Sequence, residues 1–389
     1  MNGRKQGKFI QCGIRNQEFV IEELEFDMKI VISGYYGSKN GGDEAMLAAM
    51  LEVLREEVSD LQVTVISLNP DYTKRRHNVD AVPMPDIFSI IKKIRAADLL
   101  ISGGGSLLQN VTSGRSLYYY LAIIFFALIF GRKVMLYAQG IGPIRGVLAH
   151  KVMNLILNRV DLITVRDRGS LEELSRLKIN RPKIFCTADP VLAIKPVSLE
   201  IGEKILTHHG VKKSDKKFIG VAVRHWTGWE KFQVELAEAL DKIIAATDAT
   251  IVFIPMKFPE DIRSAVSTSE LMKKNCVVFE EEFSTQEILS LVGCMDLLIG
   301  VRLHALIFAG VMGVPMLGIS YDPKIERFLD SIGEKPLGNM ADVKAQEIFD
   351  ATLKKLSEHK NFPDDKLLKE LGDLARQNAK LAVELSTPN

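Results

Sequence analysis

Two residues late in the chain, Arg302 and His304, are the strongest candidates for chemistry in this sequence. The apolar run from Asp296 to Gly300 predicts a buried strand, and the run from Leu303 to Met312 predicts a helix. The two side chains therefore lie at a helix N-terminus, where unpaired N–H groups and the helix dipole favour an anion. The planar guanidinium of Arg302 suits a carboxylate or phosphate, and His304 can carry a proton near neutral pH. The plainer alternative is an arginine paired with an acid and a core histidine bonded to backbone.

The elements that would position these residues alternate between strand and helix along the chain. Short apolar runs begin near Met28 and recur, each followed by glycine or polar residues and then by a helical pattern. This alternation predicts parallel, doubly wound sheets, which bind ligands at the carboxyl ends of their strands. A charged, mixed stretch from Val191 to Lys217 divides the series. We therefore expect two Rossmann-like α/β domains, residues 28–195 for an acceptor and residues 196–389 for a donor, the second with a helical C-terminus.

In the first domain, several predicted strands end in glycine or polar residues that would share one edge of a sheet. Asp43 is predicted as the N-cap of the first helix. The loop before it matches neither the dinucleotide-binding glycine pattern nor the P-loop, and its glycines could simply allow a tight turn. The candidate ligand-binding residues of this domain are Asp43, Gly103, Gly104, Arg166 and Asp189.

In the second domain, the predicted strand from Phe218 to Val223 ends in Arg224, His225 and Trp226. A tryptophan is costly to leave exposed and can stack on a sugar or wall a pocket. The alternative is a packing cluster under a loop. Arg224 and Arg302 would follow two strands of one sheet, which makes them a candidate pair for a doubly charged ligand.

The overall composition excludes several classes of protein. The chain has 389 residues, of which 47% are hydrophobic and 25% charged, and its formal net charge is +1, so it is not expected to bind nucleic acid. Residues 1–27 form an N-terminal extension without the apolar core of a signal peptide, so a cytoplasmic location is expected. No metal site or cofactor is predicted. The cysteines lack paired metal-ligand spacing and indicate a reducing compartment: Cys12, Cys186, Cys276 and Cys294.

One apolar run, Leu117 to Phe130, raises the question of a membrane. The run is shorter than the ~20 residues that a membrane-spanning helix needs. It predicts a buried crossover helix. The flanking residues Arg115, Arg132 and Lys133 leave open a face that touches the membrane surface.

Taken in order, the motifs resemble those of the polysaccharide pyruvyl transferases, in particular the cell-surface-anchoring CsaB type. The resemblance covers about Met28 to Phe328. It implies that the chain adopts the GT-B-like architecture of glycosyltransferases. In many GT-B enzymes an acidic residue at the start of the corresponding helix of the second domain holds the ribose of the donor. In this chain Arg302 and His304 occupy that position. The motifs are Asn40-Gly41-Gly42-Asp43-Glu44, Gly103-Gly104-Gly105, Gly140-Ile141-Gly142-Pro143, Val165-Arg166-Asp167, Ala188-Asp189-Pro190 and Arg302-Leu303-His304-Ala305.

The resemblance implies transfer of pyruvate from phosphoenolpyruvate to a sugar, forming a cyclic ketal. The acceptor it implies is N-acetylmannosamine of a lipid-linked cell-wall polysaccharide precursor, whose pyruvylated product binds S-layer proteins. The enzyme would then work in the cytoplasm at the inner face of the cell membrane. Two alternatives remain: a glycosyltransferase with a nucleotide-sugar donor, and a non-catalytic glycan-binding module.

The resemblance also assigns roles to residues. It makes Arg302, Leu303 and His304 a donor-binding element, with Arg224 as partner of Arg302. We expect His304 to act as acid or base and Asp189 as a second candidate base. The remaining expected substrate-binding residues are Gly103, Gly104, Asp43, Arg166 and Trp226.

Overall fold

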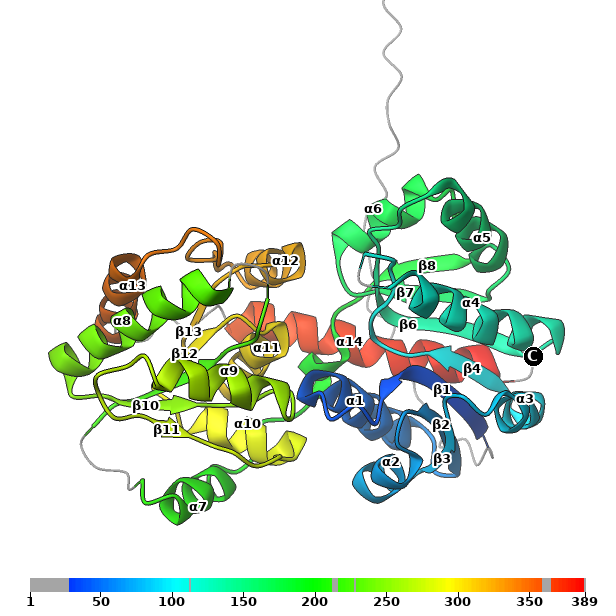
Figure 1. The fold of residues 1–389 in the computed structure, drawn as a ribbon. Helices are drawn as coiled ribbons and strands as arrows, with labels where there is room; N and C mark the ends of the chain where they lie inside the picture. The colour runs from blue at the N-terminus through cyan, green and yellow to red at the C-terminus, as the bar shows by residue number, and fades with distance from the viewer. Residues whose placement is uncertain (1–27, 112, 212–215, 227–228, 359–364, 388–389) are drawn as a thin grey trace, which may run out of the picture.

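Each apolar run that the sequence marks as a strand is paired in one of two parallel sheets (Figure 1). The computed structural model describes residues 28–111, 113–211, 216–226, 229–358 and 365–387. The predicted N-terminal extension, residues 1–27, lies outside the described residues. The prediction of two doubly wound α/β domains is confirmed.

The N-terminal sheet has the spatial order β3-β2-β1-β4-β6-β7-β8, and β5 continues along β6 beyond the end of β4. The chain moves outward from β1 to β3 and then returns to the other side of β1 to form β4. The gap between β1 and β4 is therefore the topological switch point, where such sheets bind ligands. The strands are β1 (Met28–Tyr36), β2 (Leu61–Ser67), β3 (Asp80–Pro83), β4 (Leu99–Ser102), β5 (Gly105–Leu108), β6 (Lys133–Ile141), β7 (Leu162–Val165) and β8 (Lys183–Cys186).

The C-terminal sheet repeats this plan with the order β11-β10-β9-β12-β13, so its switch point lies between β9 and β12. Arg224 follows β9 and Arg302 follows β12, which places both arginines beside that switch point. The strands are β9 (Phe218–Ala222), β10 (Thr250–Phe253), β11 (Val277–Val278), β12 (Leu297–Gly300) and β13 (Met316–Gly318).

Helices cover both faces of each sheet, as the apolar strands require. In the N-terminal half these are α1 (Gly41–Glu57), α2 (Pro70–His77), α3 (Ile87–Ala96), α4 (Gly114–Ile129), α5 (Val147–Leu157), α6 (Arg168–Arg176) and the 3₁₀ turn η1 (Pro190–Ala193). In the C-terminal half these are α7 (Glu200–His208), α8 (Trp229–Thr247), α9 (Glu260–Ser269), α10 (Thr285–Gly293), α11 (Leu303–Met312), α12 (Pro323–Ser331), α13 (Ala345–Ser357) and α14 (Asp365–Ser386).

One hydrophobic core runs continuously between the two domains. It joins side chains of α1 and α14, under the N-terminal sheet, to those of α10 and α11, under the C-terminal sheet. Because this apolar contact is shared, the N-termini of α1 and α11 are held against each other. The packing thereby fixes the distance between residues that lie far apart in the sequence.

The last helix, α14, crosses from one domain to the other (Figure 1). Leu368, near its start, lies against Gly310 of α11. Farther along, Asn378 accepts a hydrogen bond from the Thr187 hydroxyl (2.9 Å), and Arg376 donates to the Ala193 carbonyl (3.0 Å). The expected boundary at residue 196 grouped this helix with the second domain, but most of α14 packs on the first.

Two local predictions are wrong, for identifiable reasons. Asp43 is not the N-cap of α1: the Asn40 side chain accepts from the Gly42 N–H (3.3 Å), so the helix begins earlier and Asp43 lies in its first turn. The stretch from Val191 to Lys217 is not only a connection, because it forms η1 and α7. The apolar positions of α7, among them Leu206, pack against the C-terminal domain beside α10.

Helix α4 contains the apolar run that raised the question of a membrane. Its buried face, which includes Leu117, Leu121 and Ile124, packs under the N-terminal sheet, as predicted for a crossover helix. Its other face leaves Phe125 and Ile129 exposed. Among the described residues, no helix combines the length and apolar character needed to cross a bilayer.

Candidate functional site

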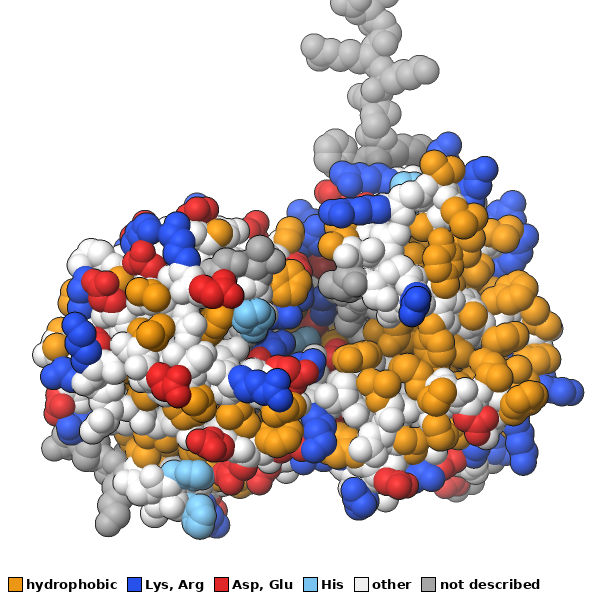
Figure 2. Space-filling view, viewed as in Figure 1, with side chains coloured by type: hydrophobic (Ala, Val, Ile, Leu, Met, Phe, Trp, Pro, Cys, Tyr) orange, Lys and Arg blue, Asp and Glu red, His pale blue; other side chains and the backbone are white. Residues whose placement is uncertain are grey.

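Residues that follow strands of both sheets line one cavity between the domains, at the hollow visible between the two lobes in Figure 2. Helices α1, α11 and α12 begin at this cavity, so their unpaired N–H groups and dipoles favour an anion there. Four of the lining side chains are Lys or Arg and one is an acid. The lining residues are Asn40, Gly42, Asp43, Met46, Gly105, Ser106, Arg166, Arg224, Met256, Arg302, Leu303, His304, Tyr321 and Lys324.

Arg302 is oriented by a buried carboxylate. Its Nη2 donates to Oδ1 of Asp261, which is only 1% exposed. The other oxygen of Asp261 accepts the backbone N–H groups of Met256 (3.2 Å) and Lys257 (2.9 Å). Burial raises the pKa of Asp261, and the charges of Arg302 and Arg224 act against that rise. The arginine is therefore paired, as the plainer alternative supposed, yet it still lines the cavity.

Arg224 is held between two aromatic rings. Its guanidinium carbon lies 4.7 Å from the centre of the Trp226 ring and 4.6 Å from that of Tyr321, and its Nη1 donates to the Tyr321 hydroxyl. Burial, and then the nearby charge of Arg302, lowers the pKa of Arg224. Trp226 does not line the cavity. It contacts Arg224 and Tyr321, so its observed role is to hold the arginine.

Both arginines have hydrogen-bonding capacity to spare. The Nε atoms of Arg224 and Arg302 are buried and have no hydrogen-bond partner among the described residues. A buried N–H without a partner is costly, so an anion with an acceptor group for each arginine could bind with a favourable hydrogen bond to each.

His304 lies in the first turn of α11 and reaches the N-terminal domain. Its Nε2 is 3.6 Å from Oδ2 of Asp189, slightly beyond hydrogen-bond length, and has no other partner among the described residues. Its Nδ1 lies against Gly42: a Cβ added at Gly42 would be 2.1 Å from that atom. The ring thus occupies the contact between the domains, with a carboxylate on one side and the start of α1 on the other.

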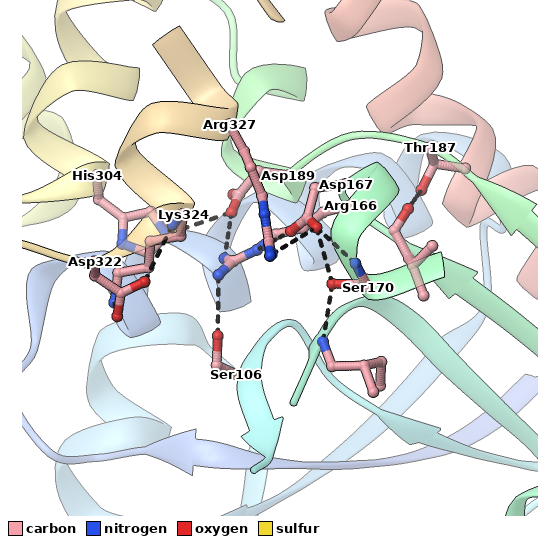
Figure 3. A network of polar contacts seen from close by, with 12 residues as sticks. Ser106, Arg166, Asp167, Ser170, Thr187, Asp189, His304, Asp322, Lys324 and Arg327 are labelled. Atoms are coloured by element: carbon pink, nitrogen blue, oxygen red, sulfur yellow. Dashed lines mark hydrogen bonds and ion pairs between the residues drawn. The ribbon is translucent and has the colours of Figure 1, made fainter. Parts of the chain in front are cut away.

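Asp189 belongs to a buried ionic network on the N-terminal side of the cavity (Figure 3). Arg166 donates from Nη1 to Asp189 Oδ2 (2.8 Å) and from Nη2 to the Ser106 hydroxyl (3.1 Å). Burial acts to raise the pKa of Asp189, but His304 and then Arg166 outweigh it and hold that pKa well below its usual range. Arg327 of the other domain donates to Asp167 (3.1 Å), the residue next to Arg166.

Asp43 is the acid that lines the cavity. Asn40 donates a hydrogen bond from its Nδ2 to Asp43 Oδ2. Burial raises the pKa of Asp43 to about 6, although the charges of His304 and Lys324 work in the opposite direction. Asp43 can therefore gain and lose a proton near neutral pH.

The structure brings most of the predicted site residues together. Arg302, Leu303, His304, Arg224, Arg166 and Asp43 line the cavity. Asp189 contacts two of them, and Trp226 holds Arg224. Gly103 and Gly104 do not line the cavity: a Cβ at Gly103 would be 2.2 Å from the Tyr36 hydroxyl oxygen, so this glycine serves close packing.

Sequence reasoning missed several side chains at the site. Tyr321 and Lys324 come from the stretch Ser320 to Lys324, a strand end whose polar residues were a usable signal. Ser106 follows the triple glycine directly, which was also a signal. Asn40 stands in the motif from Asn40 to Glu44, but its local contact with Asp43 was not predicted. Asp261 gave no signal, because its role depends on a contact across the fold.

Fold and site together define a two-domain α/β protein with a cavity, lined by three arginines and a lysine, between the carboxyl ends of its sheets. The sequence model of the family described as polysaccharide pyruvyl transferase matches residues 40–323. The chain belongs to this family and is thus a transferase of polysaccharide pyruvylation. Over 363 residues it is 23% identical to the amylovoran biosynthesis protein AmsJ of Erwinia amylovora, covering 79% of this chain and 86% of that protein.

Solved structures confirm the GT-B-like fold. The UDP-GlcNAc 2-epimerase of Methanocaldococcus jannaschii superposes with a TM-score of 0.63 at 13% identity, over 90% of this chain and 98% of that one. A putative UDP-N-acetylglucosamine 2-epimerase of Listeria monocytogenes gives 0.62 at 14% identity, over 90% and 94%. Anabaena HepE, in complex with UDP-glucose, gives 0.60 at 13% identity, over 92% and 98%. At these identities the likeness extends to the fold alone.

Proposed function

We propose that this transferase moves the pyruvyl group of phosphoenolpyruvate onto two hydroxyl groups of a sugar, forming a cyclic ketal and releasing phosphate. The observation that supports this most is the pair Arg224 and Arg302, which line one cavity with buried, unpartnered Nε–H groups. Phosphoenolpyruvate carries a carboxylate and a phosphate, one acceptor group for each arginine. Lys324 and the N-termini of α11 and α12 add to the positive potential that such a donor needs.

The reaction requires one acid and a base for each hydroxyl. A proton adds to the methylene carbon of the donor, the neighbouring carbon becomes electrophilic, and a sugar hydroxyl bonds to it while losing its proton. The carbon–oxygen bond to phosphate then breaks, its electrons leaving with the phosphate. The second hydroxyl closes the ring, and its proton passes to a base or to the departing phosphate.

We assign the proton transfers to two side chains. His304 is the acid for the methylene carbon, since it lines the cavity and reaches across to the N-terminal domain. Asp43, whose pKa is raised to about 6 by burial, is the base for a hydroxyl. Asp189 is a weak base because its pKa lies well below the usual range, so we assign it to orienting His304.

The acceptor we propose is N-acetylmannosamine of a lipid-linked precursor of a secondary cell wall polysaccharide, at the inner face of the cell membrane. This assignment follows the resemblance to the cell-surface-anchoring type, whose pyruvylated product serves S-layer anchoring. Ser106 and Arg166, on the N-terminal side of the cavity, are suited to binding sugar hydroxyls.

The test is to incubate the protein with phosphoenolpyruvate and a lipid-linked disaccharide, then to weigh the product by mass spectrometry. The expected product gains the mass of pyruvate less one water, with one phosphate released per ketal. Transfer of a sugar from a UDP-sugar, with none from phosphoenolpyruvate, would instead make the protein a glycosyltransferase. Acceptor binding without phosphate release from any donor would make it a glycan-binding module.

A further inference from the structure

Large apolar side chains cover the outer side of the N-terminal domain over α3, α4 and α5 (Figure 2). Several are more exposed than such residues usually are: Phe88 is 85%, Val147 73% and Leu148 66% exposed. Scattered apolar residues on a surface need no explanation, but a contiguous patch marks a surface that binds something. We call this patch the apolar face; its residues are Phe88, Tyr118, Phe125, Ile129, Val147, Leu148 and Leu155.

Most of the apolar face lies in a segment of the chain whose charged residues are all basic. From Leu99 to Val160 the chain contains no aspartate and no glutamate, although it has 49 acidic residues against 50 basic ones overall. The same segment supplies α4, α5 and most of the apolar face. Its exposed basic residues include Arg115 in the first turn of α4, Arg145 and Lys151 on either side of Val147 and Leu148, and Arg159 after α5.

We propose that the apolar face docks on a lipid bilayer that carries anionic phospholipids. Exposed Phe, Leu, Ile and Val enter the boundary between headgroups and acyl chains, while Lys and Arg beside them bind the headgroups. Between Leu99 and Val160, which supply every residue of the apolar face except Phe88, no acidic side chain opposes this contact. Asp86, the N-cap of α3, is the acidic residue near Phe88. A second copy of the chain fits less well, because a symmetric dimer through this face would set like charges against each other.

The position of the face explains what docking would achieve. Helix α4 begins soon after β5, and Gly105 and Ser106 of β5 line the cavity. A membrane on the apolar face would therefore hold the N-terminal domain, whose residues line one side of the cavity, at the surface that carries a lipid-linked acceptor. The benefit to a lipid-linked acceptor rests on the proposed function, whereas the docking on a bilayer does not.

Sedimentation of the full chain with vesicles tests the proposal. One set of vesicles contains equal amounts of phosphatidylglycerol and phosphatidylcholine, the other phosphatidylcholine alone. We expect binding to the first set, weaker binding to the second, and a loss of about tenfold or more in the double variant Phe125→Ser/Ile129→Ser. Its matched control is Val234→Ser, an exposed residue of α8 in the other domain, which should bind like the wild type.

Reversal of charge at two basic residues is the second part of the vesicle-binding experiment. Arg145→Glu/Lys151→Glu should weaken binding to the anionic vesicles about tenfold at low salt, while Lys231→Glu on α8 should not. Circular dichroism and thermal melts show whether each variant is folded. Equal binding by all folded variants, or no binding to either vesicle, overturns the proposal. A wild-type dimer that Phe125→Ser/Ile129→Ser splits, seen by light scattering, also overturns it in favour of a self-interface.

The outcome can be separated from that of the proposed function. Vesicle binding is measured without donor or acceptor, so it stands even when no ketal is formed. If the protein pyruvylates a water-soluble acceptor, the apolar-face variants should keep that activity and lose only the activity on lipid-linked acceptor in vesicles. Equal loss on both acceptors would mean that the face acts through the fold and not through the membrane.

Discussion

Gly42 and His304, from different domains, lie in direct contact, and the histidine ring occupies the space that a side chain at position 42 would need. A Cβ at Gly42 would be 2.1 Å from Nδ1 and 2.7 Å from Cγ of His304, far inside van der Waals contact. Gly42 stands in the first turn of α1, at the wall of the cavity. The contact therefore fixes the ring relative to both domains.

Gly42→Ala should displace the His304 ring and lower kcat by about two orders of magnitude or more, since small misplacements of a catalytic group are costly. Alanine favours the helix more than glycine does, so α1 itself should remain intact. Steady-state kinetics of pyruvyl transfer, with a thermal melt, measures both effects. The control is Gly114→Ala in the first turn of α4, where an added Cβ meets no atom within 4 Å. Wild-type turnover in Gly42→Ala would contradict the role given to the ring.

Arg302→Ala should weaken binding of phosphoenolpyruvate roughly 30- to 150-fold, as expected for the loss of a charge-assisted, bidentate contact. It should also lower the free energy of unfolding by about 3 kcal/mol, because Asp261 would remain buried without its partner. Titration calorimetry and urea denaturation measure the two effects separately. In Arg302→Ala/Asp261→Asn much of the stability should return while donor binding stays weak. Recovery of donor affinity in the double variant would show that Arg302 only compensates Asp261.

His304→Ala should lower turnover by about two to four orders of magnitude, the usual contribution of a general acid. Donor affinity should fall less than in Arg302→Ala, because both guanidinium groups remain. His304→Gln keeps hydrogen-bonding capacity but cannot deliver a proton, so it should be nearly as slow as alanine. Rapid-quench measurement of phosphate release in a single turnover isolates this step. A glutamine variant with most of the wild-type rate would reduce His304 to a binding residue.

Asp43 should make stability depend on pH. Burial raises its pKa from 3.8 to about 6, so between these values the folded protein binds a proton that the unfolded chain has released. The contribution of Asp43 to the free energy of unfolding is therefore fully present at low pH. It falls as the pH rises from about 4 to about 6, and it stays lower above that range. Between pH 4 and pH 8, Asp43→Asn should gain about 2 kcal/mol of unfolding free energy relative to the wild type.

Urea denaturation of both proteins across this pH range measures the effect, with the exposed Asp71→Asn as the control for removing a carboxylate. The same group should produce a rise in kcat/KM near pH 6 as Asp43 ionises and becomes a base. An unchanged pH profile in the Asp43→Asn variant would exclude Asp43 as the base.

Trp226→Ala should loosen Arg224, because the guanidinium would lose one of its two stacked rings. A cation–π contact of this kind contributes about 0.5–2 kcal/mol, so donor affinity should fall roughly two- to thirtyfold. Acceptor affinity should hardly change, since Trp226 does not line the cavity. Calorimetric titrations with each substrate measure the difference. A selective loss of acceptor binding would instead support stacking of Trp226 on the sugar.

The sequence by itself determined the two parallel sheets and the junction that carries the site. Buried parallel strands are apolar throughout and alternate with amphipathic helices. Both patterns can therefore be recognised from short stretches of the sequence. Helix α11 was predicted with its observed bounds, and Arg302 and His304 were placed correctly at its start. The ordered motifs also indicated the family, because they stand at successive strand ends.

Only the tertiary structure decided what these residues contact. Asp261 pairs with Arg302, Asp189 and Gly42 flank His304, and no local pattern links these partners. The reason is physical: their separation depends on how one sheet edge faces the other, and the shared core of α1, α10, α11 and α14 sets that geometry. Burial is equally a property of the fold. The same side-chain chemistry gives Asp43 a raised pKa and Asp189 a lowered one because their surroundings differ.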